Sequence, residues 1–261
     1  MTGTQAIGNG NIGVAIGSSN TVVGGTVAGL RNLISGNSHG VGLGVGGTNN
    51  QVTGNYIGTD VSGLAAIPNR NFGVWIGTNG NSIGGASVAS GNVIANNGQV
   101  GLKLEGTTGN NGTYMNNVYF GNQILAIDAR TTGRTLNDDP DSDGVLNYPV
   151  ITSTQIVGND LIVVGTMPAG KTVELYISAP TSNGVGQGRT RLASVLDDSN
   201  ADGNNVAGQF RILVPIGNGV NHGTPLTALT IGSTSEFSET KIAGEVGSSL
   251  APQITLGATT V

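Results

Sequence analysis

Three aspartates occupy alternate positions in the segment DDPDSDG: Asp139, Asp141 and Asp143, with Gly144 directly after them. Calcium prefers several oxygen ligands, and carboxylates two residues apart in a tight loop can converge on one ion. The spacing matches the first half of a DxDxDG calcium loop, but Val150 stands at the twelfth position, where such a loop carries glutamate. The segment therefore predicts either a calcium site completed by ligands from elsewhere or a bare acidic linker.

A second acidic segment, DSNADGN, carries Asp198, Asn200 and Asp202 at alternate positions. These side chains also offer oxygen ligands at the spacing of a calcium loop. The segment lies between two predicted strands, where polar residues commonly form a turn. We therefore favour a polar turn here, with calcium as the alternative.

Carboxylate pairs that could cleave a sugar are scarce in the first half of the chain. A glycoside hydrolase needs two carboxylates facing each other across the substrate, and before residue 128 the sequence has only Asp60 and Glu105. A lyase would need a cluster of calcium-binding acids near a base, but Arg31, Arg70 and Lys103 have no such cluster beside them in sequence. We interpret these residues as solvated charges and expect no enzyme activity.

The other residues that carry chemistry are His39, His222 and Trp75. No serine or cysteine beside either histidine is marked as a nucleophile, so both are expected to be exposed loop residues. Trp75 alternates with Val74 and Ile76, and it faces outward if these two fill the core. An outward indole can stack on a sugar. Alternatively, the loop that precedes it folds over it, which is the arrangement we favour.

The composition is that of a repetitive β protein. Only 10% of the 261 residues are charged, against about 25% in an average soluble domain, and Gly occurs 46 times. The net charge of −5 and the pI near 4.8 leave little basic surface for nucleic acid or an anionic membrane. Without cysteine there is no disulfide and no thiolate metal site. We therefore expect no nucleic-acid partner and no membrane insertion.

A repeat runs through the first half of the chain. GVAIG from Gly13 recurs as GVGLG from Gly40, GVWIG from Gly73 and GLKLE from Gly101. Each is followed by a second run that begins with asparagine, as in NTVVGG, NQVTGN, NSIGGA and NNVYFG. A third run completes each unit, as in RNLISGN, GNYIGTD, GNVIANN and GNQILAI. Such self-similarity indicates a repeat architecture.

The repeat unit predicts three short strands per coil. Apolar side chains alternate within each run, which is typical of strands with one buried face. Gly and Asn at the corners tolerate positive φ and allow sharp turns. Stacked coils of this kind form a parallel β-helix, in which Asn side chains at matching corners can form hydrogen-bonded ladders. The segment TDVSGLAAIPN, from Thr59, is an insertion at one corner.

The run GNYIGTDVSGLAAIPNRNFGVWIGTNGNSIGGASVASGNVIANN resembles the right-handed β-helix repeat segments of large bacterial secreted and surface proteins. These segments carry GNxIGTD, GVxI, NxIGG and RNxISGN signatures in this order. The resemblance covers roughly residues 7 to 128 and implies an all-β fold and an extracellular or cell-surface location. It implies little about function, because such segments occur in very different exported proteins.

The second half has a different pattern. Seven alternating runs follow the acidic segment and predict an antiparallel, immunoglobulin-like β-sandwich. A Ser/Gly spacer then leads to a last alternating strand. We expect a parallel β-helix over 1–128, an acidic linker over 129–148, a sandwich over 149–246 and a C-terminal tail or strand over 247–261.

These features predict a non-enzymatic structural module of a bacterial extracellular protein. The tail strand, with Gln253, Ile254, Leu256 and Val261, can pair with a neighbour's sheet edge. We expect end-to-end self-association into a filament, with residues 1–12 and 250–261 at the junction, or stacking on neighbouring modules. The alternative is a β-helix that binds or cleaves polysaccharide, as in adhesins and phage tailspikes.

Overall fold

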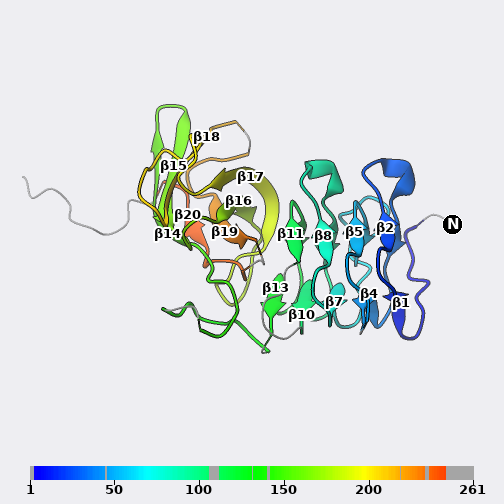
Figure 1. The fold of residues 1–261 in the computed structure, drawn as a ribbon. Coiled ribbons are helices and arrows are strands. Elements are labelled where there is room, and N and C mark those ends of the chain that lie inside the picture. Colours follow the sequence, from blue (N-terminus) through cyan, green and yellow to red (C-terminus); the bar gives the residue numbers. More distant parts are fainter. Residues whose placement is uncertain are drawn as a thin grey trace, which may run out of the picture.

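The protein is nearly all β in the computed structural model. It describes residues 3–44, 46–105, 112–130, 132–139, 142–217, 219–232 and 235–244. In this part of the chain the only helices are two 3-10 turns, η1 (Ala28–Leu30) and η2 (Val88–Ser90), and no helix is long and apolar enough to cross a membrane. A solenoid of stacked coils and a pair of antiparallel sheets follow one another along the chain (Figure 1).

Three parallel sheets run along the solenoid, and each of four coils contributes one strand to each sheet. The first sheet contains β1 (Ile12–Ile16), β4 (His39–Leu43), β7 (Val74–Ile76), β10 (Leu102–Leu104) and β13 (Ile127–Ala129). The second contains β2 (Val22–Gly24), β5 (Gln51–Thr53), β8 (Ser82–Gly84) and β11 (Thr113–Met115). The third contains β3 (Leu33–Ile34), β6 (Tyr56–Ile57), β9 (Val93–Ala95) and β12 (Val118–Phe120). The predicted parallel β-helix with three strands per coil is confirmed.

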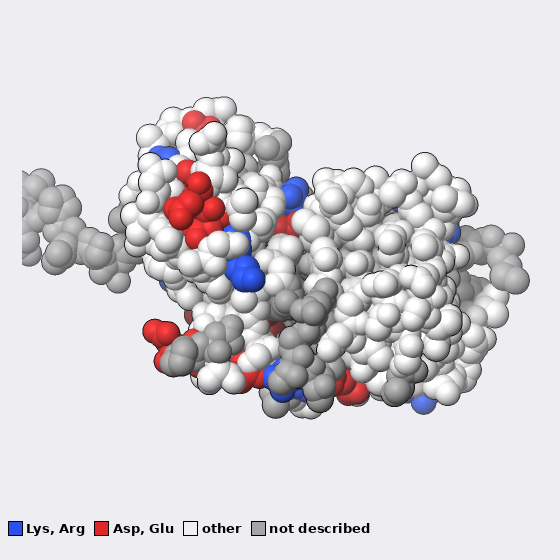
Figure 2. All heavy atoms as spheres, viewed as in Figure 1, with Lys and Arg blue, Asp and Glu red and all other residues white. Residues whose placement is uncertain are grey.

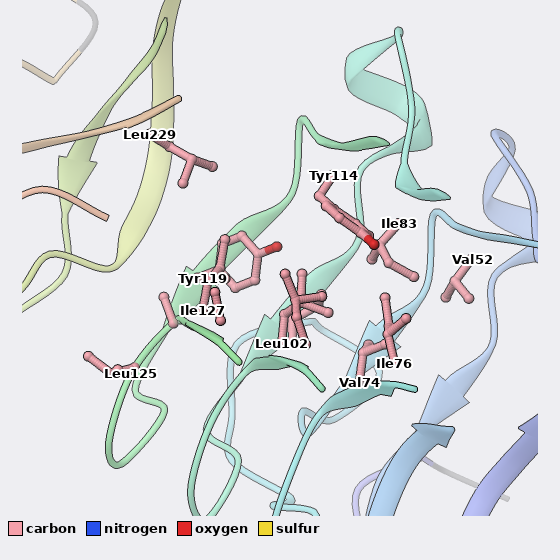
Figure 3. Packing of buried hydrophobic residues seen from close by; sticks show 14 of the residues in the cluster. Val52, Val74, Ile76, Ile83, Leu102, Tyr114, Tyr119, Leu125, Ile127 and Leu229 are labelled. Atoms are coloured by element: carbon pink, nitrogen blue, oxygen red, sulfur yellow. The ribbon is translucent and has the colours of Figure 1, made fainter. Parts of the chain in front are cut away.

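The alternating pattern of the repeats places one row of apolar side chains inside each sheet. Val74 and Ile76 are fully buried, and Leu102 lies beside Val74 in the next coil. Figure 3 shows these residues pointing into a common interior with Ile83 and Tyr114. Stacking therefore buries a continuous apolar column that a single coil has too few residues to form.

The corners of the coils depend on residues that adopt positive φ. Asn20, Asn49 and Asn96 have φ near 60°. At Gly58, with φ of 87°, an added Cβ would lie 2.1 Å from the carbonyl oxygen of Ala95 in the next coil. Gly is therefore required at this corner by both backbone conformation and close approach.

Asparagine ladders connect the coils, as the repeat predicted. The first ladder contains Asn9, Asn37, Asn69, Asn97 and Asn122. The second contains Asn32, Asn55, Asn92 and Asn117. A shorter one links Thr21, Asn50 and Asn81. In every step the earlier residue donates its backbone N–H, its side-chain amide or both to the Oδ1 of the later residue. The ladders thus have a direction along the solenoid axis.

The insertion after Thr59 forms a compact loop at a corner, as expected. A bridge pairs Thr59 with Ala66. Gly63 lies against the ring of Tyr56, and the Arg31 guanidinium lies over the same ring, 4.1 Å from its centroid. The loop therefore packs on Tyr56. The arrangement favoured from the sequence, in which the loop folds over Trp75, stays a prediction.

Two antiparallel sheets form the second unit. One contains β14 (Val150–Val157), β15 (Asp160–Thr166) and β18 (Gln209–Pro215). The other contains β17 (Gly188–Leu196), β16 (Thr172–Ser178), β19 (Pro225–Ile231) and β20 (Lys241–Ile242). Their inner faces share one apolar cluster that includes Leu161, Val173 and Phe210. In chain order, the first, second and fifth strands share one sheet, and the third, fourth, sixth and seventh share the other. The two antiparallel sheets expected from the sequence are therefore present, and the immunoglobulin-like arrangement stays a prediction.

The last strand of the sandwich is shorter than its sequence pattern predicted. The pattern covers residues 235–243, but regular pairing with β19 is limited to Lys241 and Ile242. Upstream of these residues, Ser235 and Ser238 accept hydrogen bonds from the backbone N–H groups of β19 through their side-chain hydroxyls. The backbone N–H groups of Ser235 and Ser238 also donate to the carbonyl oxygens of Thr230 and Ala228, so this segment stays bonded to β19 without forming a regular strand.

Candidate functional site

The C-terminal end of the solenoid is covered by the sandwich, and this junction holds several buried polar and charged side chains. The solenoid core continues across it, because Tyr176, Leu229 and Phe237 of the sandwich belong to the same apolar cluster as Tyr119. The Phe237 ring lies edge-on to Tyr119 at 5.7 Å and to Tyr176 at 5.5 Å. Leu229 points toward the solenoid interior in Figure 3. The two units therefore share one core.

Gln187 occupies the place of a further ladder residue beyond Asn122. Its Oε1 accepts from the backbone N of Asn122 at 3.1 Å and from the Nδ2 of Asn122 at 3.3 Å. Its Nε2 donates to the carbonyl oxygen of the same residue at 2.7 Å. Both side chains are buried. The sandwich thus satisfies the donors of the last ladder member with a side chain from a different fold.

Glu174 caps a second corner of the last coil. Its carboxylate accepts from the backbone N of Asn116 at 3.2 and 3.3 Å and from the Tyr176 hydroxyl at 2.5 Å. The Arg191 Nε donates to it at 3.1 Å and balances its charge. Glu174 is fully buried, so this carboxylate depends on these four contacts for the solvation that it loses.

Glu236 caps the first sheet. Its Oε1 accepts from the backbone N of Ala129, at the end of β13, at 2.9 Å, and its Oε2 accepts from the N of Thr135 at 2.8 Å. Burial raises the pKa of Glu236 to about 7, against the lowering effect of these two hydrogen bonds, and the nearby charge of Asp128 raises it further. This carboxylate therefore titrates near neutral pH.

A buried ion pair lies beside Glu236 on adjacent strands. The Lys103 Nζ is 2.9 Å from the Asp128 Oδ1, and both side chains are almost completely inaccessible to solvent. Lys103 also donates to the carbonyl oxygen of Arg130 at 3.3 Å, and Asp128 accepts from the N of Gly133 at 3.3 Å. These contacts join the last complete coil to the start of the linker.

The linker residues around the first calcium candidate make local hydrogen bonds. Asp138 accepts from the Ser142 hydroxyl at 2.6 Å, which lowers the pKa of Asp138. The Asp143 Oδ1 accepts from the N of Val145 at 2.7 Å, and Asp139 is exposed. Asp141 lies outside the described residues. Within the described ranges no group of three His, Cys, Asp or Glu side chains is arranged to hold a metal, so calcium at this loop stays a prediction.

The second calcium candidate connects β17 of one sheet to β18 of the other. Asp198 and Asn200 are exposed, and Asp198 adopts a left-handed turn with φ of 55°. Asp202 is buried, and its Oδ1 accepts from the backbone N of Arg211 at 2.8 Å. The three side chains therefore differ in environment, and Asp202 stabilises the segment that connects β17 to β18.

Trp75 lies on the outer face of the first sheet, as the alternation predicted. The indole is half-buried and its Nε1 donates to the Glu105 Oε2 at 2.6 Å. Gly42 and Gly77 flank the ring. Asp60 lies in the inserted loop after β6, where the Ser62 hydroxyl lowers the pKa of its carboxyl and the backbone N–H of Ala65 also donates to it.

The two histidines occupy different environments. His39 begins β4, is partly buried and packs on Phe72, with 5.1 Å between ring centroids. Desolvation lowers the pKa of His39, so its partial burial differs from the exposed position expected. His222 is exposed in the loop before β19, as predicted.

Gln187, Glu174 and Glu236 were not singled out from the sequence. The only local signal is a carboxylate at Glu174, between Val173 and Leu175 in an otherwise apolar strand. The assembly residues Gln253, Ile254, Leu256 and Val261 lie outside the described part of the chain. No model of a known protein family matches this sequence, and no curated protein matches it.

Proposed function

We propose that this chain is a non-enzymatic structural module of a bacterial extracellular or cell-surface protein. The β-solenoid serves as a stiff spacer that stacks on neighbouring modules, and the sandwich terminates its C-terminal end. The observation that carries this proposal is the extension of the Asn ladder into the sandwich by Gln187. It is supported by the resemblance of the repeats to those of bacterial surface proteins.

Where a solenoid ends, both its apolar interior and its backbone hydrogen-bond donors must be covered. The end of the last coil would otherwise expose an apolar cross-section and unpaired backbone donors. Phe237 and Leu229 cover the cross-section, while Glu174 and Glu236 accept from backbone donors of the last coil. Every ladder step runs in the same direction, so the C-terminal end of the solenoid presents hydrogen-bond donors and the sandwich covers them with acceptor side chains.

The charged residues of the coils also fit a structural role. Asp60 is held by the backbone and hydroxyl groups of its own loop, and Glu105 by the Trp75 indole. These carboxylates follow strands of different sheets. In Figure 2 the visible face of the solenoid is almost entirely uncharged, and the acidic side chains gather over the sandwich and the lower edge. A spacer requires no charged cleft.

A carbohydrate-binding role is the second candidate, and the setting of Trp75 favours it. The ring is half-exposed on the outer face of a sheet, between two glycines that leave its neighbourhood open. Aromatic faces of this kind stack on sugars. In this role Glu105 would hold the orientation of the indole.

Incubation with a panel of polysaccharides separates the two candidates. The structural proposal expects no release of reducing or unsaturated ends and no retention that depends on Trp75. Activity of the wild-type chain that is lost in Asp60→Asn or Glu105→Gln, or binding that is lost in Trp75→Ala, would overturn it. Glu239→Gln is the matched control, because Glu239 is an exposed carboxylate on the sandwich.

End-to-end association through the C-terminal tail is a further part of the proposal. The sandwich covers the C-terminal end of the solenoid, so coils of two copies have no free C-terminal edge for direct stacking in this arrangement. Any filament must therefore use other segments, such as residues 250–261. Light scattering on the full chain and on a chain without residues 248–261 tests this. A full chain that stays monomeric at high concentration would remove the filament.

A further inference from the structure

The two ends of the solenoid core differ in burial. The inward residues of the second coil, such as Val41 and Val52, are completely buried. Their equivalents in the first coil, Val14 and Val23, are only partly buried. Parallel pairing leaves β1, β2 and β3 as the edge strands of their sheets in the described structure. Ile16 and Ile34 of the first coil are buried, so the N-terminal end exposes part of the apolar cross-section, at Val14 and Val23, beside the edges of β1 and β2.

The ladder bonds at this end run from donors in one coil to the Oδ1 of an asparagine in the next. Asn32 is exposed, and its N and Nδ2 both donate to the Asn55 Oδ1, at 3.1 and 2.9 Å. Asn55 and Asn92 each use Oδ1 to accept from the preceding coil and Nδ2 to donate to one of its carbonyl oxygens. Asn32 is the first member of this ladder, so its Oδ1 stands ready to accept from a coil on its N-terminal side.

Residues 3–9 already follow the course that the end of an earlier coil would take. Asn9 is a full member of the first ladder, because its backbone N donates to the Asn37 Oδ1 at 2.8 Å. Upstream of it, Gly8 lies against the carbonyl group of Gly36, and the oxygen of Gly3 accepts from the N of Val61. Residues 3–8 therefore run beside the third-sheet segment after β3, where the last strand of an earlier coil would lie.

From this geometry we infer that the end formed by β1, β2 and Asn32 is a docking surface for one further β-solenoid coil of the same repeat type. This coil contributes strands over β1 and β2 and donates a backbone N–H and an Asn amide to the Asn32 Oδ1. The inference rests on the proposed structural function and names the partner of its N-terminal end.

A second copy of this chain fits the surface poorly. Head-to-tail stacking requires a free C-terminal coil edge, and in each copy the sandwich covers that edge. Head-to-head stacking places the Asn32 Oδ1 acceptor of one copy against the same acceptor of the other. Only a coil with a free C-terminal edge presents the matching donors.

A one-coil extension of the full chain tests the inference. A copy of residues 69–96 is inserted between Gly8 and Asn9, so that the junction Asn96-Asn9-Gly10 reproduces the native Asn96-Asn97-Gly98. We expect amide hydrogen exchange in β1 and β2 to slow at least about tenfold, and Tm to rise by about 3–6 °C. In the extended chain, Asn32→Ala should lower Tm more than it does in the original chain.

The control carries the same insert with its copies of Val74, Ile76 and Ile83 changed to Ser, and it should give neither effect. Unchanged exchange in β1 and β2, or an insert whose own amides remain unprotected, would overturn the inference. It would also be overturned by a wild-type dimer that protects β1 and β2. The polysaccharide assay is independent of all these outcomes, so the proposed function can stand when this inference fails.

Discussion

The Gln187 Oε1 accepts from the N and Nδ2 of Asn122 at 3.1 and 3.3 Å, the same two contacts that the Asn122 Oδ1 receives from Asn97 at 3.1 and 2.9 Å. A β-sandwich thereby reproduces the hydrogen bonding of a solenoid coil. Glutamine has one methylene more than asparagine, and this extra length lets the residue directly before β17 reach the ladder position. The cap is specific because it matches donors with acceptors.

Gln187→Ala should destabilise the junction by about 1–3 kcal/mol, because it leaves the buried donors of Asn122 unpaired. Gln187→Glu keeps an acceptor but loses the donor to the Asn122 carbonyl oxygen, and it buries a charge. We expect it to destabilise as well. Urea unfolding with hydrogen exchange at residues 122–129 measures both effects. Gln123→Ala, at an exposed neighbour, is the control and should change little. Equal stability of Gln187→Ala and the control would contradict the ladder cap.

The solenoid was predictable because its signals are local and repeated. The alternation in GVWIG places Val74 and Ile76 inside and Trp75 outside, and the corner asparagines predict the ladders. The junction was not predictable, because Glu236 reaches the N of Ala129 across 107 residues and Gln187 reaches Asn122 across 65. No local pattern records such pairing. The contact of the inserted loop with Tyr56 was not predictable either, because no local pattern pairs Gly63 with that ring.

Calcium is expected to bind the linker loop and to stabilise the chain. Asp139, Asp141 and Asp143 repel one another unless a cation or solvent screens them. Calorimetric titration to several millimolar calcium should release heat, and addition of a chelator should lower Tm. The double variant Asp139→Asn, Asp143→Asn should lose both effects, while Asp198→Asn should keep them. A titration without heat and an unchanged Tm would remove the site.

The Lys103–Asp128 pair should be costly to break and much less costly to replace. Lys103→Met alone leaves the buried Asp128 carboxylate without its cation and should cost about 3–5 kcal/mol. Asp128→Leu alone should be similarly destabilising, because it leaves a buried ammonium. The double variant removes both charges, so its loss should be smaller than the sum of the two single losses. Urea unfolding of the four proteins gives the coupling energy. Additive losses would show that the two charges do not interact.

Glu236 should make the stability of the chain depend on pH between about 4.5 and 7. Burial raises its pKa from the ordinary 4.5 to about 7, so the folded chain binds the proton more tightly than the unfolded chain. The stability that protonation provides is fully present below pH 4.5. It is lost as the pH rises through 7, by up to about 3 kcal/mol.

Glu236→Gln removes this titration, because an amide stays neutral across the range while its oxygen can still accept one backbone hydrogen bond. We therefore expect the fall in the free energy of unfolding between pH 4.5 and 7 to flatten in this variant. Glu239→Gln, at an exposed carboxylate of the same segment, should keep the wild-type profile. Asp60 and Asp138 have lowered pKa values. The stability that these two carboxylates contribute is lost as the pH falls below 4.5, outside the range in which Glu236 titrates. A profile for Glu236→Gln that matches the wild type would show that Glu236 does not carry the pH dependence.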